Sequence, residues 1–154
     1  MRRKDKEIKE VENIIKIIDN CKECSIAFFD DEYPYLIPLN FGHEYSDEIN
    51  LYFHGASEGK KLDLIKKNNK VAFEMHNVEE INISKIACKS TTKFESVNGT
   101  GEIEILEKED KVKGLNLIMK HYTKKDYKID ENILKTVCVF KLKVNEIYGK
   151  SFNR

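Results

Sequence analysis

The chain has 154 residues, which suits one domain over residues 1–154, and 40% of them are apolar, enough for a hydrophobic core. Its 27 basic and 27 acidic side chains cancel, so no overall charge would draw it to nucleic acid or to an anionic membrane surface. Because no apolar run could cross a bilayer and the charged start lacks the apolar stretch of a secretory signal, we expect a cytoplasmic protein without nucleic-acid or membrane partners.

The first part of the chain predicts a helix followed by a β-hairpin. Apolar residues recur at helical spacing through residues 5–19, with lysines and glutamates between them, which predicts an amphipathic helix. Residues 24–29 are predicted to form a strand, residues 30–32 a turn, and residues 33–41 the paired strand. The only two prolines of the chain fall in this second strand, where they cannot donate ladder hydrogen bonds, so we expect it at an edge or interrupted.

The middle of the chain predicts two strands joined by a short helix. Residues 49–54 are predicted to form a strand that ends at a turn of small residues. Apolar residues among lysines then predict a short helix, with Ser57 as its N-cap. Residues 70–75 predict the next strand, and residues 76–90 show no clear period.

The last part of the chain adds strands and a second amphipathic helix. Residues 91–106 predict a long strand or a hairpin, broken at 98–101 by its glycines. Residues 112–122 have helical spacing, and residues 138–145 alternate as a half-buried final strand. About six strands with helices at the connections favour an antiparallel barrel, although periodicity alone leaves other α+β folds open.

The segment with the clearest chemical pattern joins the strand at 49–54 to the short helix. Free backbone N–H groups at a helix start favour an anion. Gly55, Ala56 and Gly59 allow the backbone to come close to such an anion. Lys60 and Lys61 add positive charge, so the segment suits a phosphate, although an ordinary turn with solvated lysines fits it equally well. Neither a P-loop nor a dinucleotide-binding fingerprint is present.

The cysteines and histidines predict no metal site. Cys21 and Cys24 form one C-x-x-C, but a zinc site needs four ligands and no second pair follows, so small buried thiols are expected. No two histidines have a metal-ligand spacing. His43 is predicted to lie solvated in a loop, and His76 and His121 are predicted to be surface residues.

Several motifs occur together and in a fixed order along the chain. They are residues 1–8, residues 33–42, residues 51–56, the pair Gly59 and Lys60, and the pattern Cys88, Thr91, Phe94, Glu95, Ser96, Val97, Gly99 and Gly101. Together they resemble the FMN-binding proteins related to 5-nitroimidazole resistance, within the pyridoxamine-phosphate-oxidase-like superfamily. The resemblance implies a mainly β fold with flanking helices, a six-stranded antiparallel split β-barrel of the FMN-binding type. It also implies a homodimer with FMN at the subunit interface.

The resemblance further implies a set of flavin-contacting residues from four parts of the chain. Pro38, Leu39, Asn40 and Phe41 would run beside the ring, His54, Gly55 and Ala56 beside the ring and ribityl chain, Lys60 and Lys61 at the phosphate, and Ser96 and Val97 on a neighbouring strand.

His54 is the candidate catalytic residue, because a side chain that titrates near neutrality can orient or protonate an electron acceptor. A strand-end histidine satisfied by a neighbour is the alternative. The leading hypothesis is a flavin-dependent oxidoreductase that passes electrons from FMN to a small planar acceptor such as a nitroaromatic compound. A non-enzymatic flavin- or haem-binding protein on the same barrel is the alternative. A pyridoxamine-phosphate oxidase ranks third, since only Lys150 and Arg154 follow the final strand as basic residues.

Overall fold

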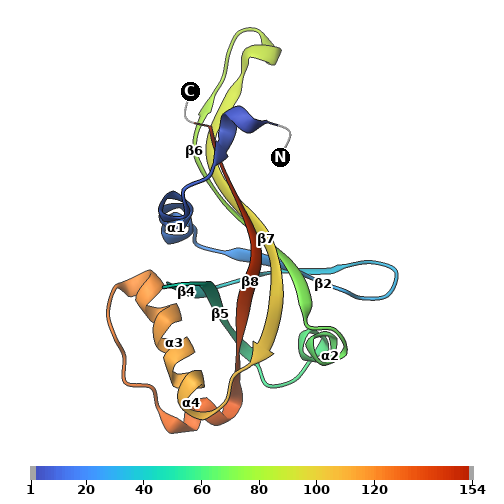
Figure 1. Ribbon diagram of the computed structural model, residues 1–154, viewed down its shortest axis with the longest axis vertical. Coiled ribbons are helices and arrows are strands. Elements are labelled where there is room, and N and C mark those ends of the chain that lie inside the picture. Colours follow the sequence, from blue (N-terminus) through green and yellow to red (C-terminus); the bar gives the residue numbers. More distant parts are fainter. Residues whose placement is uncertain (1–2, 153–154) are drawn as a thin grey trace.

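The computed structural model describes residues 3–152 and shows one antiparallel β-sheet with helices on its flanks (Figure 1). The predicted class is confirmed, with eight described strands in place of six. The strands are β1 (Glu7–Ile8), β2 (Cys24–Phe28), β3 (Tyr35–Leu39), β4 (Phe41–Tyr45), β5 (Ile49–Ala56), β6 (Lys70–Asn82), β7 (Thr91–Ile105) and β8 (Val137–Phe152). The helices are α1 (Val11–Asn20), α2 (Lys60–Lys67), α3 (Lys108–Thr123) and α4 (Glu131–Thr136), with 3-10 turns η1 (Lys4–Lys6) and η2 (Ala87–Lys89).

The sheet curls until its two edge strands meet. Its strand order is β3-β2-β6-β7-β8-β5-β4, with β1 added against β8. The edge strands β3 and β4 are consecutive in the chain and are separated by Asn40 alone. The predicted strand at 33–41 is therefore two strands with different partners, because β3 pairs with β2 and β4 pairs with β5. This break between two edges is the split of the barrel.

The first predicted helix is shorter than its apolar spacing indicates. It begins at Val11, because Glu7 and Ile8 are extended and pair with Lys150 and Gly149 on β8. Ladder hydrogen bonds to another strand replace the helical ones there, and the sequence spacing of Ile8 does not distinguish the two. The helix still buries Ile14, Ile17 and Ile18 against the sheet, as its spacing predicts.

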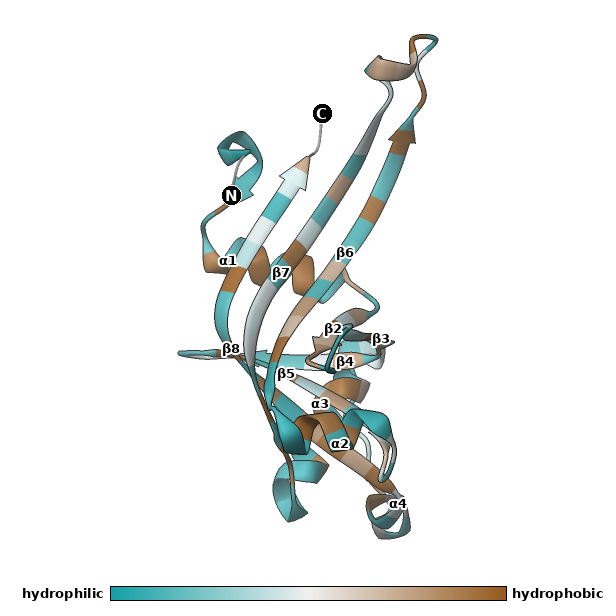
Figure 2. Cartoon of the chain, turned by 90° about the vertical axis from the view of Figure 1, so that its right-hand side faces the viewer, coloured by the Kyte–Doolittle hydropathy of each residue, from teal (hydrophilic) through white to brown (hydrophobic). Residues whose placement is uncertain are grey.

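Two long strands, β6 and β7, extend where the sequence predicts irregular chain. β6 continues to Asn82, and β7 runs without a break from Thr91 to Ile105 (Figure 2). The predicted break at 98–101 does not interrupt the strand, although the pairing of β7 with β8 shifts register between Thr100 and Gly101. Gly99 permits close packing of strands and makes no turn. A Cβ on Gly99 would collide with the carbonyl oxygen of Glu146 on β8 and lie 2.8 Å from the ring of Phe73 on β6.

The core lies inside the curled sheet and beneath α1 and α2. The rings of Phe53 on β5 and Phe140 on β8 stack at its centre, with centroids 5.4 Å apart and an angle of 18° between planes. A second apolar cluster joins α3 to the outer side of β5 and β8 through Tyr52, Leu115, Ile118 and Val139, among others. None of the described helices combines the length and apolar character that a membrane span requires.

β8 is the longest described strand and contacts three other strands along its course. It pairs with β7 along most of its course, with β5 at its beginning and with β1 near its end. In Figure 1 it extends from α4 past α1, and the β6–β7 hairpin projects beyond its far end. It begins directly after α4, a short helix that the sequence pattern does not predict.

Candidate functional site

The predicted phosphate-binding turn lies where β5 ends and α2 begins. The N-cap of α2 is Gly59, at φ 114°, and no side chain caps the helix. The prediction of Ser57 as N-cap is therefore wrong, because α2 starts at Lys60 and the cap position needs the positive φ that glycine adopts readily. The first backbone N–H groups of α2 are left without a side-chain acceptor, so they are available to an anion.

Lys61 places a half-buried ammonium group beside this turn. Its Nζ atom occupies the space that a Cβ on Gly55 would fill, and it lies 5.0 Å from the centroid of the Phe140 ring. Burial lowers the pKa of Lys61. The nearby Cys138 thiol acts in the opposite direction, but burial has the larger effect. No described carboxylate pairs with this ammonium group, whereas other lysines of the same helix have such partners. The charge thus lacks a counter-ion, which a phosphate would provide.

Lys60 points away from Lys61 and already has a partner. Its Nζ atom lies 2.6 Å from Asp30 Oδ2 and 5.1 Å from the centroid of the Tyr35 ring. This ion pair with the β2–β3 connection raises the pKa of Lys60, first through the hydrogen bond to Asp30. Lys60 would have to leave Asp30 to contact a phosphate, so Lys61 is the better placed of the two predicted lysines.

The three other predicted residues of β5 lie next to Lys61. His54, Gly55 and Ala56 pair with consecutive residues at the start of β8. The His54 side chain is exposed at the strand surface. Its pKa is lowered, first by burial of part of the ring and second by the positive charge of Lys61. His54 is therefore neutral at pH 7 and becomes a proton donor only in more acidic solution.

The segment Pro38–Phe41 crosses the split of the barrel. Pro38 and Leu39 lie on β3, whose outer edge pairs with no described strand, so the predicted edge position is confirmed. Asn40 is exposed, but the Phe41 ring is fully buried in the core and faces away from any surface ligand. Only the backbone of Phe41 can therefore border a ligand.

Tyr122 holds this segment in place through hydrogen bonds of its hydroxyl group. Its sequence pattern predicts only that it belongs to a helix. Its hydroxyl accepts hydrogen bonds from Phe41 N at 3.1 Å and Asn40 Nδ2 at 3.2 Å. It donates one to the carbonyl oxygen of Lys22 at 2.6 Å. Contacts across some eighty residues of sequence have no local signal, so helical spacing alone could not reveal this role.

Ser96 and Val97 lie far along β8 from His54, although pairing through β2 and β6 brings them near the register of Pro38 and Leu39. Ser96 pairs with Lys150, whereas His54 pairs with Val139, so the two are 11 positions apart on β8, roughly 35 Å of extended strand. The Val97 side chain is fully buried in the core, and that of Ser96 is half-buried. One copy of the chain therefore does not bring all the predicted flavin residues together.

Two histidines differ from their predicted surroundings. His121 is 6% exposed, and His43 lies half-buried on β4, so the predictions of a surface residue and a solvated loop are wrong. The reason is that α3 packs on β4, which places His121 against the backbone of Cys21 and leaves His43 beside Asp19 at the end of α1. His76 is exposed, as predicted.

Cys21 and Cys24 are buried free thiols, and burial raises the pKa of Cys21 to about 11, which fits apolar packing.

Comparisons with known proteins identify the family of this chain and solved structures with the same fold. Residues 10–151 match the family model for pyridoxamine 5'-phosphate oxidase. A solved structure of a candidate 5-nitroimidazole antibiotic resistance protein from Bacteroides thetaiotaomicron is 30% identical, with 95% of this chain and 86% of that chain covered and a TM-score of 0.79. No curated protein matches the sequence.

Two more distant structures share the fold. The flavocytochrome Anf3 from Azotobacter vinelandii is 16% identical, with 100% of this chain and 72% of that chain covered and a TM-score of 0.81. The FAD and haem binding protein from Mycobacterium smegmatis is 15% identical, with 97% and 74% covered and a TM-score of 0.83.

Proposed function

The chain belongs to the pyridoxamine 5'-phosphate oxidase family, and on that premise we propose that it is an FMN-binding oxidoreductase that reduces small planar acceptors such as 5-nitroimidazoles. The observation that carries this proposal is the half-buried ammonium group of Lys61, which lacks a carboxylate partner among the described residues and lies against Gly55. A similar protein at 30% identity, a candidate for 5-nitroimidazole resistance, supports the choice of acceptor.

The residues near Lys61 fit the parts of FMN in order. Lys61 and the uncapped start of α2 would hold the phosphate, and Gly55 leaves the space that the Lys61 ammonium group occupies. The open edge of β3 beside Asn40 would offer backbone groups to the polar edge of the ring. Bound FMN would supply the electron-transfer chemistry, and the side chains would bind it, orient it and exclude water.

The proposed site requires a second copy of the chain. The cavity nearest the α2 turn has a volume of about 230 Å³, and its lining includes Ser57, Leu62 and Cys138 but neither Lys61 nor His54. Sites for small molecules usually enclose roughly 300–1,000 Å³, so this cavity is too small to be the flavin site, and we propose that a second copy completes the site at Lys61. A homodimer in which Ser96 of one copy lies near Lys61 of the other would assemble the two separated groups of residues.

Flavin binding and turnover are tested on the purified full-length protein. We expect one FMN per chain, measured by quenching of flavin fluorescence, and a dimer by sedimentation. Added 5-nitroimidazole should then reoxidise the anaerobically photoreduced complex faster than it reoxidises free FMN in buffer. Binding without faster reoxidation would support a non-enzymatic flavin protein. Absence of FMN binding, with a Soret band after haem addition that His54→Ala abolishes, would replace the proposal by haem binding.

The reoxidation rate is expected to depend on the protonation of His54. Burial and Lys61 both disfavour its charged form, so the pKa is below the ordinary 6.5 and the imidazole is neutral at pH 7. The rate should therefore rise as the pH falls through that lowered pKa, because the proton donor forms only there. In His54→Gln we expect a flat profile and a rate about 100-fold lower at acidic pH.

The control for this experiment is His76→Gln, which removes an exposed histidine paired with Glu74 at 3.0 Å. That variant should keep the wild-type pH profile. FMN affinity should change little in either variant. An unchanged pH profile in His54→Gln would assign the proton donor to another group.

A further inference from the structure

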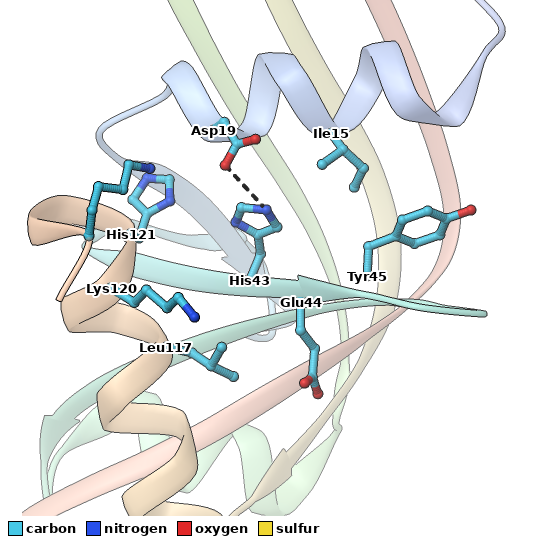
Figure 3. A pocket seen from close by; sticks show the side chains of 9 residues that line it. Ile15, Asp19, His43, Glu44, Tyr45, Leu117, Lys120 and His121 are labelled. Atoms are coloured by element: carbon cyan, nitrogen blue, oxygen red, sulfur yellow. Dashed lines mark ion pairs between the residues drawn. The ribbon is translucent and has the colours of Figure 1, made fainter. Parts of the chain in front are cut away.

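Three metal-ligating side chains from three different elements meet outside the proposed flavin site. Asp19 comes from α1, His43 from β4 and His121 from α3, and Figure 3 shows them around one hollow. One ligand atom from each residue lies within 4.8 Å of the other two. The three residues line a cavity of about 430 Å³ together with Ile15 and Leu117, among others.

His121 presents a ring nitrogen that has no partner. Its Nε2 atom lies 2.8 Å from the carbonyl oxygen of Cys21, which can only accept, so Nε2 carries the proton and donates it. The Nδ1 atom therefore bears the lone pair, and it is buried without a described hydrogen-bond partner. Histidines that bind metals usually donate their other N–H to a carbonyl or carboxylate group, which fixes the ring in this way.

His43 has the same property from the opposite side of the cavity. Its Nδ1 atom is also buried without a described partner, and its Nε2 atom lies 3.6 Å from Asp19 Oδ1. The two imidazole rings stand edge to face, with centroids 5.7 Å apart. Asp19 lies on the Nε2 side of His43, so a metal ion shared with Asp19 would bind that nitrogen. At His121 the same ion would give the buried Nδ1 atom the partner that it lacks.

We propose that Asp19, His43 and His121 bind a divalent transition metal ion of the zinc type, with a fourth coordination position open to the cavity. Two imidazoles and one carboxylate are an established donor set for such ions. Ligand atoms in a tetrahedral zinc site lie roughly 3.3 Å apart, so these side chains must close by about 1.5 Å at most. The Asp19 side chain is 46% exposed and is free to make that movement.

The charges around the cavity decide which metals fit. Lys120 and Lys124 also line it and oppose any cation. Glu44 does not offset them, because it accepts a hydrogen bond from Tyr52 and pairs with Lys113 at 2.8 Å. Affinity must therefore come from bonds to imidazole nitrogen, which favour zinc, nickel or copper over magnesium and calcium.

Binding is tested by titrating chelator-treated full-length protein with zinc and, separately, with magnesium. We expect one zinc per chain by calorimetry and no magnesium binding. The chain has four histidines, so a ¹H–¹⁵N spectrum of the imidazole groups can resolve each of them. Zinc should shift the ring signals of His43 and His121 and leave those of His54 and His76 unchanged.

Variants separate this site from incidental binding at the surface. Asp19→Asn and His43→Gln should each weaken zinc binding by more than ~10–100-fold. That range is typical for loss of a residue that only hydrogen-bonds to a metal ligand. His76→Gln, beside exposed Glu74, and Cys88→Ser, an exposed thiol, should bind zinc like wild type. Asp19 is exposed enough that Asp19→Asn should fold normally, which circular dichroism checks.

Zinc affinity in a folded Asp19→Asn or His43→Gln that equals that of wild type would overturn the proposal. So would zinc-induced shifts confined to His54 or His76. The test is run without flavin, so its outcome is independent of FMN binding.

Discussion

Lys61→Met is expected to bind FMN about 10–100-fold more weakly than wild type. A hydrogen bond to a charged group contributes about 1.5–3 kcal/mol, and this lysine is the one we assign to the phosphate. Methionine keeps an apolar stem against the Phe140 ring, so the packing of the turn is preserved. Affinity is measured by quenching of FMN fluorescence at fixed ionic strength.

The same substitution is expected to stabilise the flavin-free protein. Burial lowers the pKa of Lys61, which means that its charged form is less favourable in the folded than in the unfolded chain. Removing that charge should raise the melting temperature by a few degrees, corresponding to about 1 kcal/mol for a chain of this length. If Lys61→Met binds FMN more weakly and has a higher melting temperature than wild type, Lys61 reduces the stability of the flavin-free protein but contributes to FMN binding.

Lys67→Met is the matched control, since it removes a lysine from the same helix. Lys67 is exposed and pairs with Asp31 at 2.7 Å. We expect its FMN affinity to stay within about twofold of wild type, because exposed ion pairs contribute little. If Lys61→Met bound FMN as tightly as this control, the phosphate would have to be held elsewhere.

Gly99→Ala is expected to destabilise the fold by about 3 kcal/mol or more. The added Cβ would collide with the backbone carbonyl of Glu146 on β8 and press on the Phe73 ring at 2.8 Å. Because a backbone atom cannot turn aside as a flexible side chain does, β7 and β8 would have to separate. Alanine also lowers the entropy of the unfolded chain, which stabilises a protein by about 0.4–1 kcal/mol at a compatible site. This gain is too small to offset the collision.

Urea unfolding followed by circular dichroism measures this effect. Thr100→Ala is the control, because Thr100 is the next residue on β7 and its side chain is exposed. It should change the free energy of unfolding by about 1 kcal/mol at most. If Gly99→Ala lay within 1 kcal/mol of wild type, the close approach of β7 and β8 would not be required for stability.

The sequence predicts the elements whose signal is local. Isoleucine spacing predicts α1 and alternation predicts the start of β8, because burial of one face leaves a period in the sequence. Runs of strand-forming residues that end at turns predict β2 and β5. The prolines correctly predict an edge for β3. The small-residue turn at Gly55 correctly predicts a strand that leads into a helix, although the cap is Gly59.

Features that depend on distant partners are not predicted. Gly99 has the same local appearance in a turn as in a tight strand crossing, and only Glu146 on β8 decides between them. The burial of His121 depends on Cys21, one hundred residues away, and on the packing of α3 over β4. Spacing rules for metal ligands likewise cannot detect Asp19, His43 and His121, which converge from three separate elements.

β8 carries partners of His54 at one end and of Ser96 at the other, so in the proposed dimer every site would draw on both chains. A defect at one end of β8 and a defect at the other end would then act on different halves of a site. A mixed dimer of two such defective chains would contain one site with both defects and one site with none. Two harmful substitutions, one at each end of β8, would therefore complement each other when they lie on different chains. When both lie on the same chain, a dimer of that chain would have both defects in every site.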